Sequence, residues 1–432
     1  KNMAVRTKRF IGKNKSCSCS MPGVWRAAAF CDGFAVIFHS PRACAHVARS
    51  MDINAHYRSI AAGYGEYLAA VPLVSSQLEE KHSIFGGTER LKQCIRWVVE
   101  KYNPQCIVIA NSCVAGVIGD DVESVGLEAE MEFNLPVITV NTYGFLDGEY
   151  YEGYFEAAKK IMLRFCKPQR CEKGTALLLG DNGGPWGSYA REVTCLLNEL
   201  NIEVIGQFPG YTAFNDLPYI TRAQACIVLG GRGQTHIGLS KLAQIFKDKY
   251  NMDYLPGKYP VGWTETKDWI KGIGDLFNCR DEAAALILRE NLRLNKAVKK
   301  FLPVTEGVKT VICIGRWLMY FNPAWIIQIA ERIRLSVIGI VLLPGYNEQE
   351  KSLMLKAVQK CCNIPVYENL SDEDLMEQVQ LILTTHELQG TNVKQIFLPM
   401  LPTVGTTGEI EFIQLIYRTL CSKNRYGGIV YG

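Results

Sequence analysis

The sequence lacks the features that mark several common protein classes. Its longest apolar run, residues 335–344, is far short of the ~20 residues that cross a membrane, and no signal-peptide core is visible. The formal net charge is only +4, with no sustained basic stripe, so nucleic-acid binding has no electrostatic basis. We therefore predict a protein that binds neither a membrane nor nucleic acid.

Motifs for the commoner catalytic and nucleotide sites are also missing. There is no CxxC pair and no His-x3–5-His spacing, which argues against the usual zinc sites, and the absence of GxSxG argues against a serine hydrolase. Two glycine-rich segments, 180–187 and 230–233, follow predicted strands but match neither GxGxxG nor the P-loop. We interpret both as tight turns and predict that the chain does not hydrolyse ATP itself.

Cysteine, in contrast, is abundant, with 16 residues in a chain of 432. Cys106, Cys226 and Cys313 lie in apolar, strand-like runs, where a free cysteine behaves as a small buried hydrophobe. Cys166 and Cys171 flank a basic segment, and we interpret them as part of a linker rather than as low-pKa thiols. A secreted disulfide framework would be short and loop-rich, so this cysteine usage favours the reducing cytoplasm as the location.

Short apolar runs alternate with longer helical stretches, the pattern of parallel βαβ units. The length favours two or three domains, and we place three α/β domains, at residues 1–170, 171–305 and 306–432, each with a mostly parallel sheet flanked by helices. Residues 1–16, with six basic and no acidic residues, are predicted to form a flexible arm. The predicted strands are 34–38, 106–110, 137–140, 175–179, 204–205, 226–229, 310–314 and 337–343, and the predicted helices are 88–101, 189–200, 281–301, 323–334 and 407–421.

Three cysteines have local contexts unlike the rest. Cys19 opens Cys-Ser-Met-Pro-Gly, Cys44 closes His-Ser-Pro-Arg-Ala-Cys 25 positions later, and Cys113 lies in Asn-Ser-Cys-Val-Ala-Gly-Val-Ile-Gly-Asp-Asp. Cys44 and Cys113 are expected in loops just after strands, and parallel sheets bind ligands outside the carboxyl ends of their strands. Thiolates suit iron–sulfur clusters. Three thiolates leave such a cluster incomplete, so we expect a second subunit to supply the other ligands.

These residues resemble the nitrogenase component 1 family. The resemblance rests on the spacing of Cys19 and Cys44, on the His39–Cys44 loop, on residues 75–91, and above all on Cys113 with Ile118-Gly119-Asp120-Asp121. It implies three Rossmann-like domains and an iron–sulfur cluster, of the 8Fe–7S P-cluster type or 4Fe–4S, that is shared with the partner subunit. It also implies that Cys19, Cys44 and Cys113 are this subunit's metal ligands.

The resemblance implies two partners as well. One is an α-type subunit, in an α2β2 heterotetramer, and the other is a homodimeric ATP-dependent iron protein that delivers electrons. In the family's cofactor-bearing subunit, one cysteine and one histidine hold a large catalytic cluster. Here Gly230 occupies the cysteine position and residues 401–408 contain no histidine, which implies a β-type subunit without a catalytic residue of its own.

Two further departures bear on the substrate. The family's HGPxGC loop has Ser40 and Ala43 in place of two glycines, and residues 142–145 lack a serine that can ligate the oxidised cluster in dinitrogenase β subunits. We therefore expect an oxidoreductase subunit that relays electrons for reduction of a substrate other than N2, such as a methylthio-alkane or another small molecule. Three alternatives stay open: a tetrapyrrole-reductase subunit, a cofactor-assembly scaffold subunit, and a metal-free α/β protein with incidental cysteines.

Overall fold

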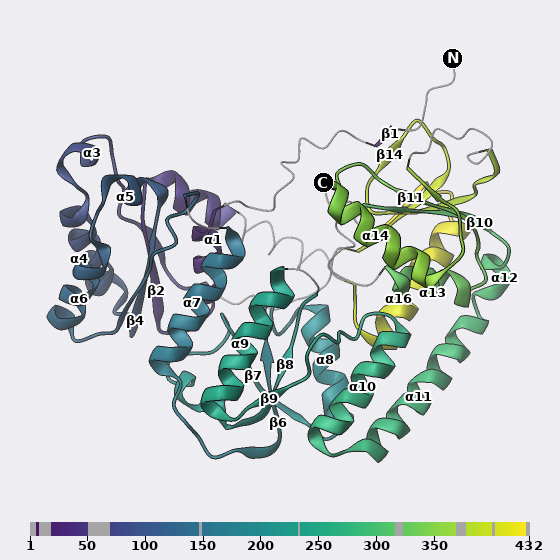
Figure 1. The fold of residues 1–432 in the computed structure, drawn as a ribbon, viewed down its shortest axis with the longest axis horizontal. Coiled ribbons are helices and arrows are strands. Elements are labelled where there is room, and N and C mark those ends of the chain that lie inside the picture. Colours follow the sequence, from purple (N-terminus) through teal and green to yellow (C-terminus); the bar gives the residue numbers. More distant parts are fainter. Residues whose placement is uncertain are drawn as a thin grey trace.

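The computed structural model of the chain describes residues 6–7, 19–50, 70–146, 149–231, 234–315, 323–368, 377–399 and 402–428. These residues form three parallel sheets flanked by helices, which confirms the predicted α/β class and its Rossmann-like units (Figure 1). The sheets follow one another in chain order within the three predicted ranges. The domain boundaries themselves, at residues 170 and 305, stay predictions.

The first sheet has the strand order β3-β2-β4-β5, and all its neighbours are parallel. Its strands are β2 (Phe34–His39), β3 (Leu73–Ser75), β4 (Cys106–Asn111) and β5 (Val137–Val140). Helices α4 (Thr88–Tyr102) and α6 (Val122–Phe133) pack on one face, and α1 (Met21–Ala28) and α7 (Tyr150–Phe165) pack on the other. Because both faces are buried, its central strands are continuous apolar runs in the sequence.

The second sheet has the order β7-β6-β8-β9, again parallel. Its strands are β6 (Glu172–Leu179), β7 (Glu203–Phe208), β8 (Ala223–Val228) and β9 (Asp253–Tyr254), and its helices are α8 (Ser188–Asn198), α9 (Gln234–Tyr250) and α10 (Trp263–Phe277). The predicted glycine-rich turn after β6 is present, and it opens with Gly180 at a φ of +124°, a conformation that favours glycine.

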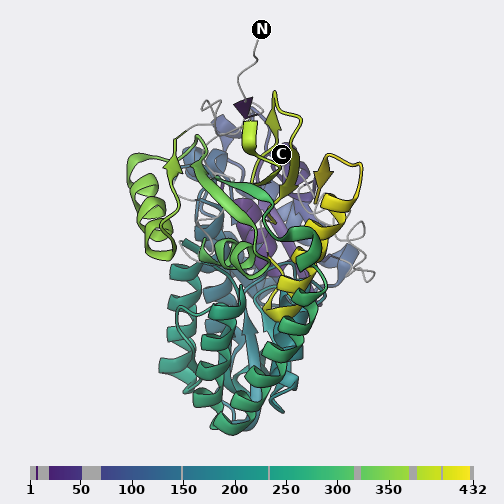
Figure 2. The same ribbon diagram turned by 90° about the vertical axis from the view of Figure 1, so that its right-hand side faces the viewer.

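The third sheet has six parallel strands in the order β12-β11-β10-β13-β15-β16. Its strands are β10 (Lys309–Ile314), β11 (Ser336–Leu342), β12 (Val366–Tyr367), β13 (Leu381–Thr384), β15 (Lys394–Phe397) and β16 (Tyr426–Gly427), and its helices are α12 (Leu302–Thr305), α13 (Ala324–Arg332), α14 (Glu348–Cys361) and α16 (Gly405–Cys421). The long helix α11 (Arg280–Lys299) links the second unit to the third, where it packs against α16 (Figures 1 and 2).

Two large apolar cores join the three units. Side chains of β6 alternate between them: Leu177 and Leu179 pack with α1 and α7 of the first unit, whereas Ala176 and Leu178 pack in the core that continues into the third unit. The second sheet therefore lies between the other two units and holds them together. Of the predicted N-terminal arm, only Arg6–Thr7 is described; as β1 it pairs antiparallel with β14 (Leu388–Gln389) of the third unit, and the rest of residues 1–16 lies outside the described residues.

Other predictions are tested by burial. Cys106, Cys226 and Cys313 are fully buried in their strands, as expected of small hydrophobes. Burial raises the pKa of the Cys166 thiol to about 12, which confirms that it is not a reactive low-pKa thiol. Within the described part of the chain, no helix has the length and apolar character needed to cross a membrane.

Candidate functional site

The first sheet reverses its strand order between β2 and β4, and this switch point positions the site. β2 has β3 on one side and β4 on the other, so the chain leaves the two central strands in opposite directions. His39 ends β2 and Asn111 ends β4, and these two residues are paired across the sheet. Cys44 lies five residues after His39, and Cys113 lies two residues after Asn111. The carboxyl ends of these strands are where open α/β sheets bind ligands.

Each of the three cysteines lies at the start of a helix. Cys19 directly precedes Ser20, the N-cap of α1. Cys113 is the first residue of α5 (Cys113–Ile118), whose N-cap Ser112 accepts a hydrogen bond from the Ala115 N–H at 3.2 Å. Cys44 lies in the first turn of a helix that covers residues 42–50. The prediction of loops at Cys44 and Cys113 is therefore wrong, because a proline and a capping serine start helices there.

The structure brings these cysteines together around Gly144. A Cβ placed on Gly144 would lie 3.6 Å from the Cβ of Cys113 and 3.7 Å from the Sγ of Cys19. The same Cβ would lie 3.0 Å from the backbone nitrogen of Cys113, and Gly144 has a φ of +59°, so glycine is the residue that fits this close approach. Cys44 is near enough to Cys113 for the two thiols to interact electrostatically.

The surroundings of Cys44 act on its thiol in opposite directions. Partial burial raises the pKa of Cys44, a hydrogen bond with Ser40 lowers it, and the neighbouring Cys113 thiol raises it again, so that the net pKa lies above the ordinary value. Helix N-termini favour the thiolate form that binds metals. A cation between the two sulfur atoms would offset the repulsion between Cys44 and Cys113 in their thiolate forms, so this arrangement suits a group that carries positive metal ions.

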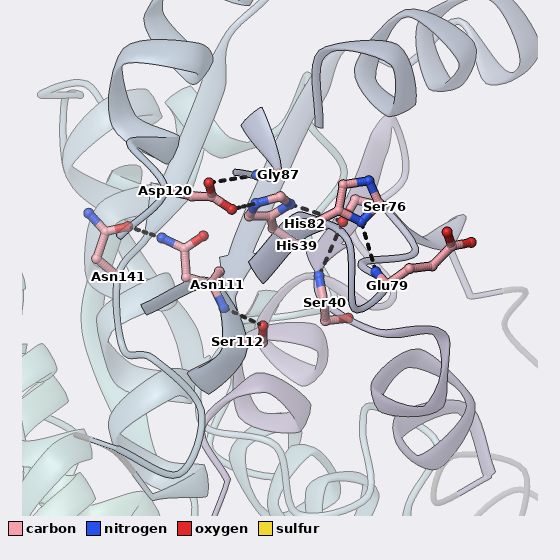
Figure 3. Close-up of polar contacts among 11 residues, drawn as sticks. His39, Ser40, Ser76, Glu79, His82, Gly87, Asn111, Ser112, Asp120 and Asn141 are labelled. Carbon is pink, nitrogen blue, oxygen red and sulfur yellow. Dashed lines mark hydrogen bonds and ion pairs between the residues drawn. The ribbon is translucent and has the colours of Figure 1, made fainter. Parts of the chain in front are cut away.

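A buried network holds the backbone behind the cysteines (Figure 3). His39 Nε2 is 2.9 Å from Asp120 Oδ2, and its Nδ1 is 2.9 Å from Ser76 Oγ. Asp120 Oδ1 accepts a hydrogen bond from the Gly87 N–H at 2.8 Å, and Ser76 Oγ accepts one from the Ser40 N–H at 3.2 Å. Burial lowers the pKa of His39, against the opposing effects of its hydrogen bond with Asp120 and of that residue's charge.

These contacts fit a neutral His39 that carries its proton on Nε2. The Asp120 carboxylate accepts, so Nε2 carries the proton, and Nδ1 then accepts from the Ser76 hydroxyl. The neutral imidazole thus satisfies every polar atom of the network, in keeping with its lowered pKa. His39 and Asp120 belong to two of the motifs in the sequence, but their contact was not predicted, because they are 81 residues apart in the chain.

The donor set fits a cluster better than a single ion. No three His, Cys, Asp or Glu side chains among the described residues converge closely enough to hold one metal ion. In a 4Fe–4S cluster each cysteine ligand binds a different iron, so the thiols stand apart around the cluster rather than converging on a point. Cys19, Cys44 and Cys113 would be the residues that hold such a group, and this ligand assignment stays a prediction.

Gly230 and the polar residues of the second and third units bear on the expected absence of a catalytic cofactor. Gly230, at the position where the resemblance places that cysteine, has a φ of +136°, which L side chains rarely adopt. Cys226 is fully buried in β8, and His236 Nδ1 forms a 2.6 Å hydrogen bond with Tyr259 Oη, as an ordinary polar residue does. In the third unit, His386 lies after β13 beside Gly315 and hydrogen-bonds Thr385 Oγ1 at 2.7 Å.

Exposed apolar side chains lie in the segments that carry or adjoin the three cysteines. On α5, Val114 and Val117 are solvent-exposed, Val117 by 76%. Phe145 and Leu146 follow Gly144 and are also exposed. Further exposed apolar residues lie in the adjoining segments: Val47, Ile84 and Phe85. We call these seven residues the apolar rim; an exposed apolar surface of this kind marks an interaction site.

Comparison with known proteins gives the family. The family model described as "Nitrogenase component 1 type Oxidoreductase" matches residues 19–410. A nitrogenase iron-molybdenum cofactor biosynthesis protein NifE from Clostridium pasteurianum is 27% identical over 248 residues, which are 56% of this chain and 52% of that protein. A NifE from Rippkaea orientalis is 23% identical, over 70% of this chain and 65% of that protein.

Two further comparisons cover more of the chain. A nitrogenase molybdenum-iron protein alpha chain from Acidithiobacillus ferridurans is 24% identical over 88% of this chain and 78% of its own length. The structure of nitrogenase Cp1 at pH 6.5 shares the fold, with a TM-score of 0.66 at 17% identity over 99% of this chain and 98% of that one. The chain thus spans only 52% and 65% of the two NifE relatives. From the family model and these relatives together, the chain belongs to the nitrogenase component 1 family of oxidoreductases.

Proposed function

We propose that the chain is the β-type subunit of a nitrogenase-like reductase, in which it holds half of an iron–sulfur cluster shared with an α-type partner. The cluster relays electrons from an ATP-dependent iron protein to a catalytic cofactor in the partner. The observation that carries the proposal is the gathering of Cys19 and Cys113 at Gly144, with Cys44 in electrostatic contact, at the switch point of the first sheet.

The need for a partner subunit follows from the incomplete set of cluster ligands on this chain. Three thiols on one chain leave an iron–sulfur cluster without its full set of ligands, and the half-exposed cysteines lie in or beside the segments that carry the apolar rim. A second subunit that covers the rim would exclude water from the site and supply the remaining thiolates. The rim therefore supports assembly into the αβ pair, and the α2β2 heterotetramer is the proposed form.

The relay role rests on what the second unit lacks. A catalytic cofactor held by one cysteine and one histidine would need a side chain at Gly230, and the positive φ there disfavours any residue but glycine. Residues 402–408 contribute no histidine either. We therefore place the catalytic cofactor in the partner. The similarity to an alpha chain and to NifE supports membership of the family. The β-type role is proposed from Gly230 and from residues 402–408.

The substrate proposal rests on Gly144. Because Gly144 packs against the Cys113 backbone, position 144 has no room for a serine side chain without local movement. A cluster without that hydroxyl ligand loses one means of changing its coordination on oxidation. We accordingly place the substrate outside N2, among carbon–sulfur compounds such as a methylthio-alkane or other small molecules, with a tetrapyrrole as the alternative.

Anaerobic co-purification tests the proposal. The chain is expressed together with its α-type partner, and iron, molybdenum and vanadium are counted per αβ pair, with EPR spectra of the reduced and oxidised complex. We expect cluster iron that requires both chains, and ATP-dependent substrate reduction once an iron protein is added. A colourless, iron-free complex would contradict the proposal and favour a metal-free α/β protein.

A scaffold subunit for cofactor assembly is the second candidate, and the relatives that are named as cofactor biosynthesis proteins favour it. Such a scaffold would use the same cysteines for a permanent cluster and would release a cofactor precursor rather than a reduced product. Sustained turnover of substrate by the purified complex excludes the scaffold. Iron without turnover, together with transfer of metal to an apo-reductase, excludes the relay.

A further inference from the structure

Asp120 lies at the junction of three segments around the cysteine site. It follows α5, whose first residue is Cys113, and the turn between them is fixed by Gly119, which has a φ of +79° and donates its N–H to Ala115 O at 3.0 Å. Asp120 also donates its own N–H to the same carbonyl, at 3.2 Å. Its backbone is therefore rigidly connected to Cys113 through one short helix.

The carboxylate of Asp120 connects this helix to the other cysteine segment. Oδ2 bonds to Nε2 of His39, the last residue of β2, from which the chain continues to Cys44. Both side chains are buried, with 0% of His39 and 3% of Asp120 exposed. Just past the strand ends, one backbone hydrogen bond, from the Ser112 N–H to His39 O at 3.2 Å, still joins the two exits, and the side-chain bridge is a second link that fixes their spacing.

The other oxygen of the carboxylate reaches a third segment. Oδ1 accepts the Gly87 N–H, and a Cβ on Gly87 would lie only 2.6 Å from Oδ2 and 3.2 Å from His39 Cε1. Glycine is thus the residue that lets the backbone come close enough to donate. Gly87 directly follows the exposed segment α3 (His82–Phe85) and Gly86, so the bridge also ties part of the apolar rim to the cysteine site.

We infer that Asp120 is the positioning residue of the site: through His39 and Gly87 it sets the spacing of the Cys44 and Cys113 segments and hence retention of the shared cluster. This inference rests on the proposed function for the cluster itself. None of the hydrogen bonds described for Asp120 goes to a cysteine, so it acts through the backbone it fixes. Groups that orient metal ligands in this way strongly affect metal affinity when they are removed.

Asp121 supplies a matched control. It is the next residue in the chain, is exposed, and caps α6 by accepting from the Ser124 N–H at 3.1 Å, away from the bridge. Asp120→Ala removes both arms of the bridge, whereas Asp121→Ala removes only a helix cap. Asp120→Asn is the conservative variant: its amide oxygen can still accept from Gly87, and its amide nitrogen can donate to His39 once the imidazole takes its other tautomer.

The first experiment measures iron release from the anaerobically purified complex to a ferrous chelator. We expect Asp120→Ala to release iron about tenfold faster than wild type or more, Asp120→Asn to lie between the two, and Asp121→Ala to match wild type. The EPR signal of Asp120→Ala should also shift or broaden. An unchanged release rate in Asp120→Ala would overturn the inference, as would equal acceleration in Asp120→Ala and Asp121→Ala.

A second measurement does not depend on iron. Hydrogen exchange of the metal-free chain, read by mass spectrometry, should rise in Asp120→Ala both in the peptide that contains residues 39–44 and in that of residues 112–118. Asp121→Ala should raise exchange in the start of α6 alone. If the wild-type complex binds no iron, the proposed function fails, but hydrogen exchange of the metal-free chain still tests the role of Asp120. Unchanged exchange in both peptides of Asp120→Ala would overturn the inference.

Discussion

Gly153 of α7 lies directly against the carbonyl oxygen of Ser20, so that a Cβ on Gly153 would be 2.1 Å from that oxygen. The contact is reciprocal, because a Cβ on Gly23 of α1 would be 1.8 Å from the carbonyl oxygen of Tyr150. Two glycines thus let α1 and α7 pack backbone to backbone. Since Cys19 directly precedes Ser20, this crossing also fixes where the Cys19 thiol lies.

Gly153→Ala should therefore push α1 away from α7. We expect a loss of about 1–3 kcal/mol in the free energy of unfolding, the usual effect of overpacking, together with less iron bound per complex. Urea unfolding and iron analysis measure the two effects. Gly206→Ala is the control, because a Cβ there would meet only Leu177, at an ordinary 3.8 Å. Equal stability of the two variants would show that the crossing tolerates a methyl group.

An ion pair joins the first unit to the second. Arg26 Nε donates to Asp181 Oδ2 at 2.6 Å and Arg26 Nη2 to Oδ1 at 3.0 Å, and the Tyr211 hydroxyl also donates to Oδ1, at 2.5 Å. Burial raises the pKa of Asp181, whereas Arg26 and the hydrogen bonds lower it. The lowering effects together are larger, so the pKa of Asp181 lies below the ordinary value. The pair therefore stabilises the fold above the ordinary aspartate pKa of about 3.9, and this stability is lost as pH falls through the folded-state pKa.

Arg26→Met should reverse this pH dependence. Without the guanidinium, burial outweighs the remaining hydrogen bonds from Tyr211 and Gly183 and raises the pKa of Asp181, so the variant should lose stability as pH rises from about 5 to about 7.5. At the higher pH we expect a loss of about 3–5 kcal/mol relative to wild type. Urea unfolding of the metal-free chain at both pH values is the measurement. Arg96→Met, which breaks a solvent-exposed pair with Glu132, should leave stability nearly unchanged at either pH. A variant that keeps the wild-type pH dependence would contradict this account.

The sequence predicted those elements whose residues carry their own signal. β5 has the predicted bounds, Val137–Val140. β2 and β4, which are buried on both faces and are therefore nearly unbroken apolar runs, each extend one residue beyond the prediction. The sequence also predicts helix α4, because Leu91, Ile95 and Val98 recur at helical spacing. Local pattern was sufficient in each of these cases.

The site shows where local pattern is not sufficient. α5 has six residues and the helix at 42–50 starts within a motif rich in serine and proline, so neither has the periodicity that marks a helix. The bridge between His39 and Asp120 and the contact of Gly153 with Ser20 join residues that are distant in the sequence. Such pairs follow from strand order and helix crossing, which a single sequence does not fix. The motifs therefore predicted three cysteines as ligands, a prediction that stays open, and the structure supplied the contacts that hold their segments.

The apolar rim predicts how the partner binds. Val117 lies on α5, close to Cys113, and 76% of it is exposed in this chain. Val117→Asp should place a charge in the desolvated centre of the interface and weaken the αβ pair about tenfold or more. Size-exclusion chromatography with light scattering measures the assembly. Leu292→Asp, at a similarly exposed position on α11, should leave it intact. Assembly that is unaffected by Val117→Asp would place the interface elsewhere.

Cys113 offers the most direct test of the ligand assignment. Cys113→Ala removes the thiol that is in electrostatic contact with Cys44, so the cluster would lose one of its three anchors on this chain. We expect the complex to lose most of its cluster iron and its EPR signal, because a thiolate bound to iron cannot be replaced by a methyl group.

Cys106→Ala is the control for Cys113→Ala, because Cys106 belongs to the same strand–helix segment but is fully buried in β4, where burial raises its pKa well above the ordinary value. Its removal should lower stability by about 1 kcal/mol, through lost packing, and leave the iron content unchanged. Iron content that survives Cys113→Ala but not Cys106→Ala would defeat the assignment. Loss in Cys113→Ala alone would establish that this thiol, rather than cysteine content in general, holds the metal.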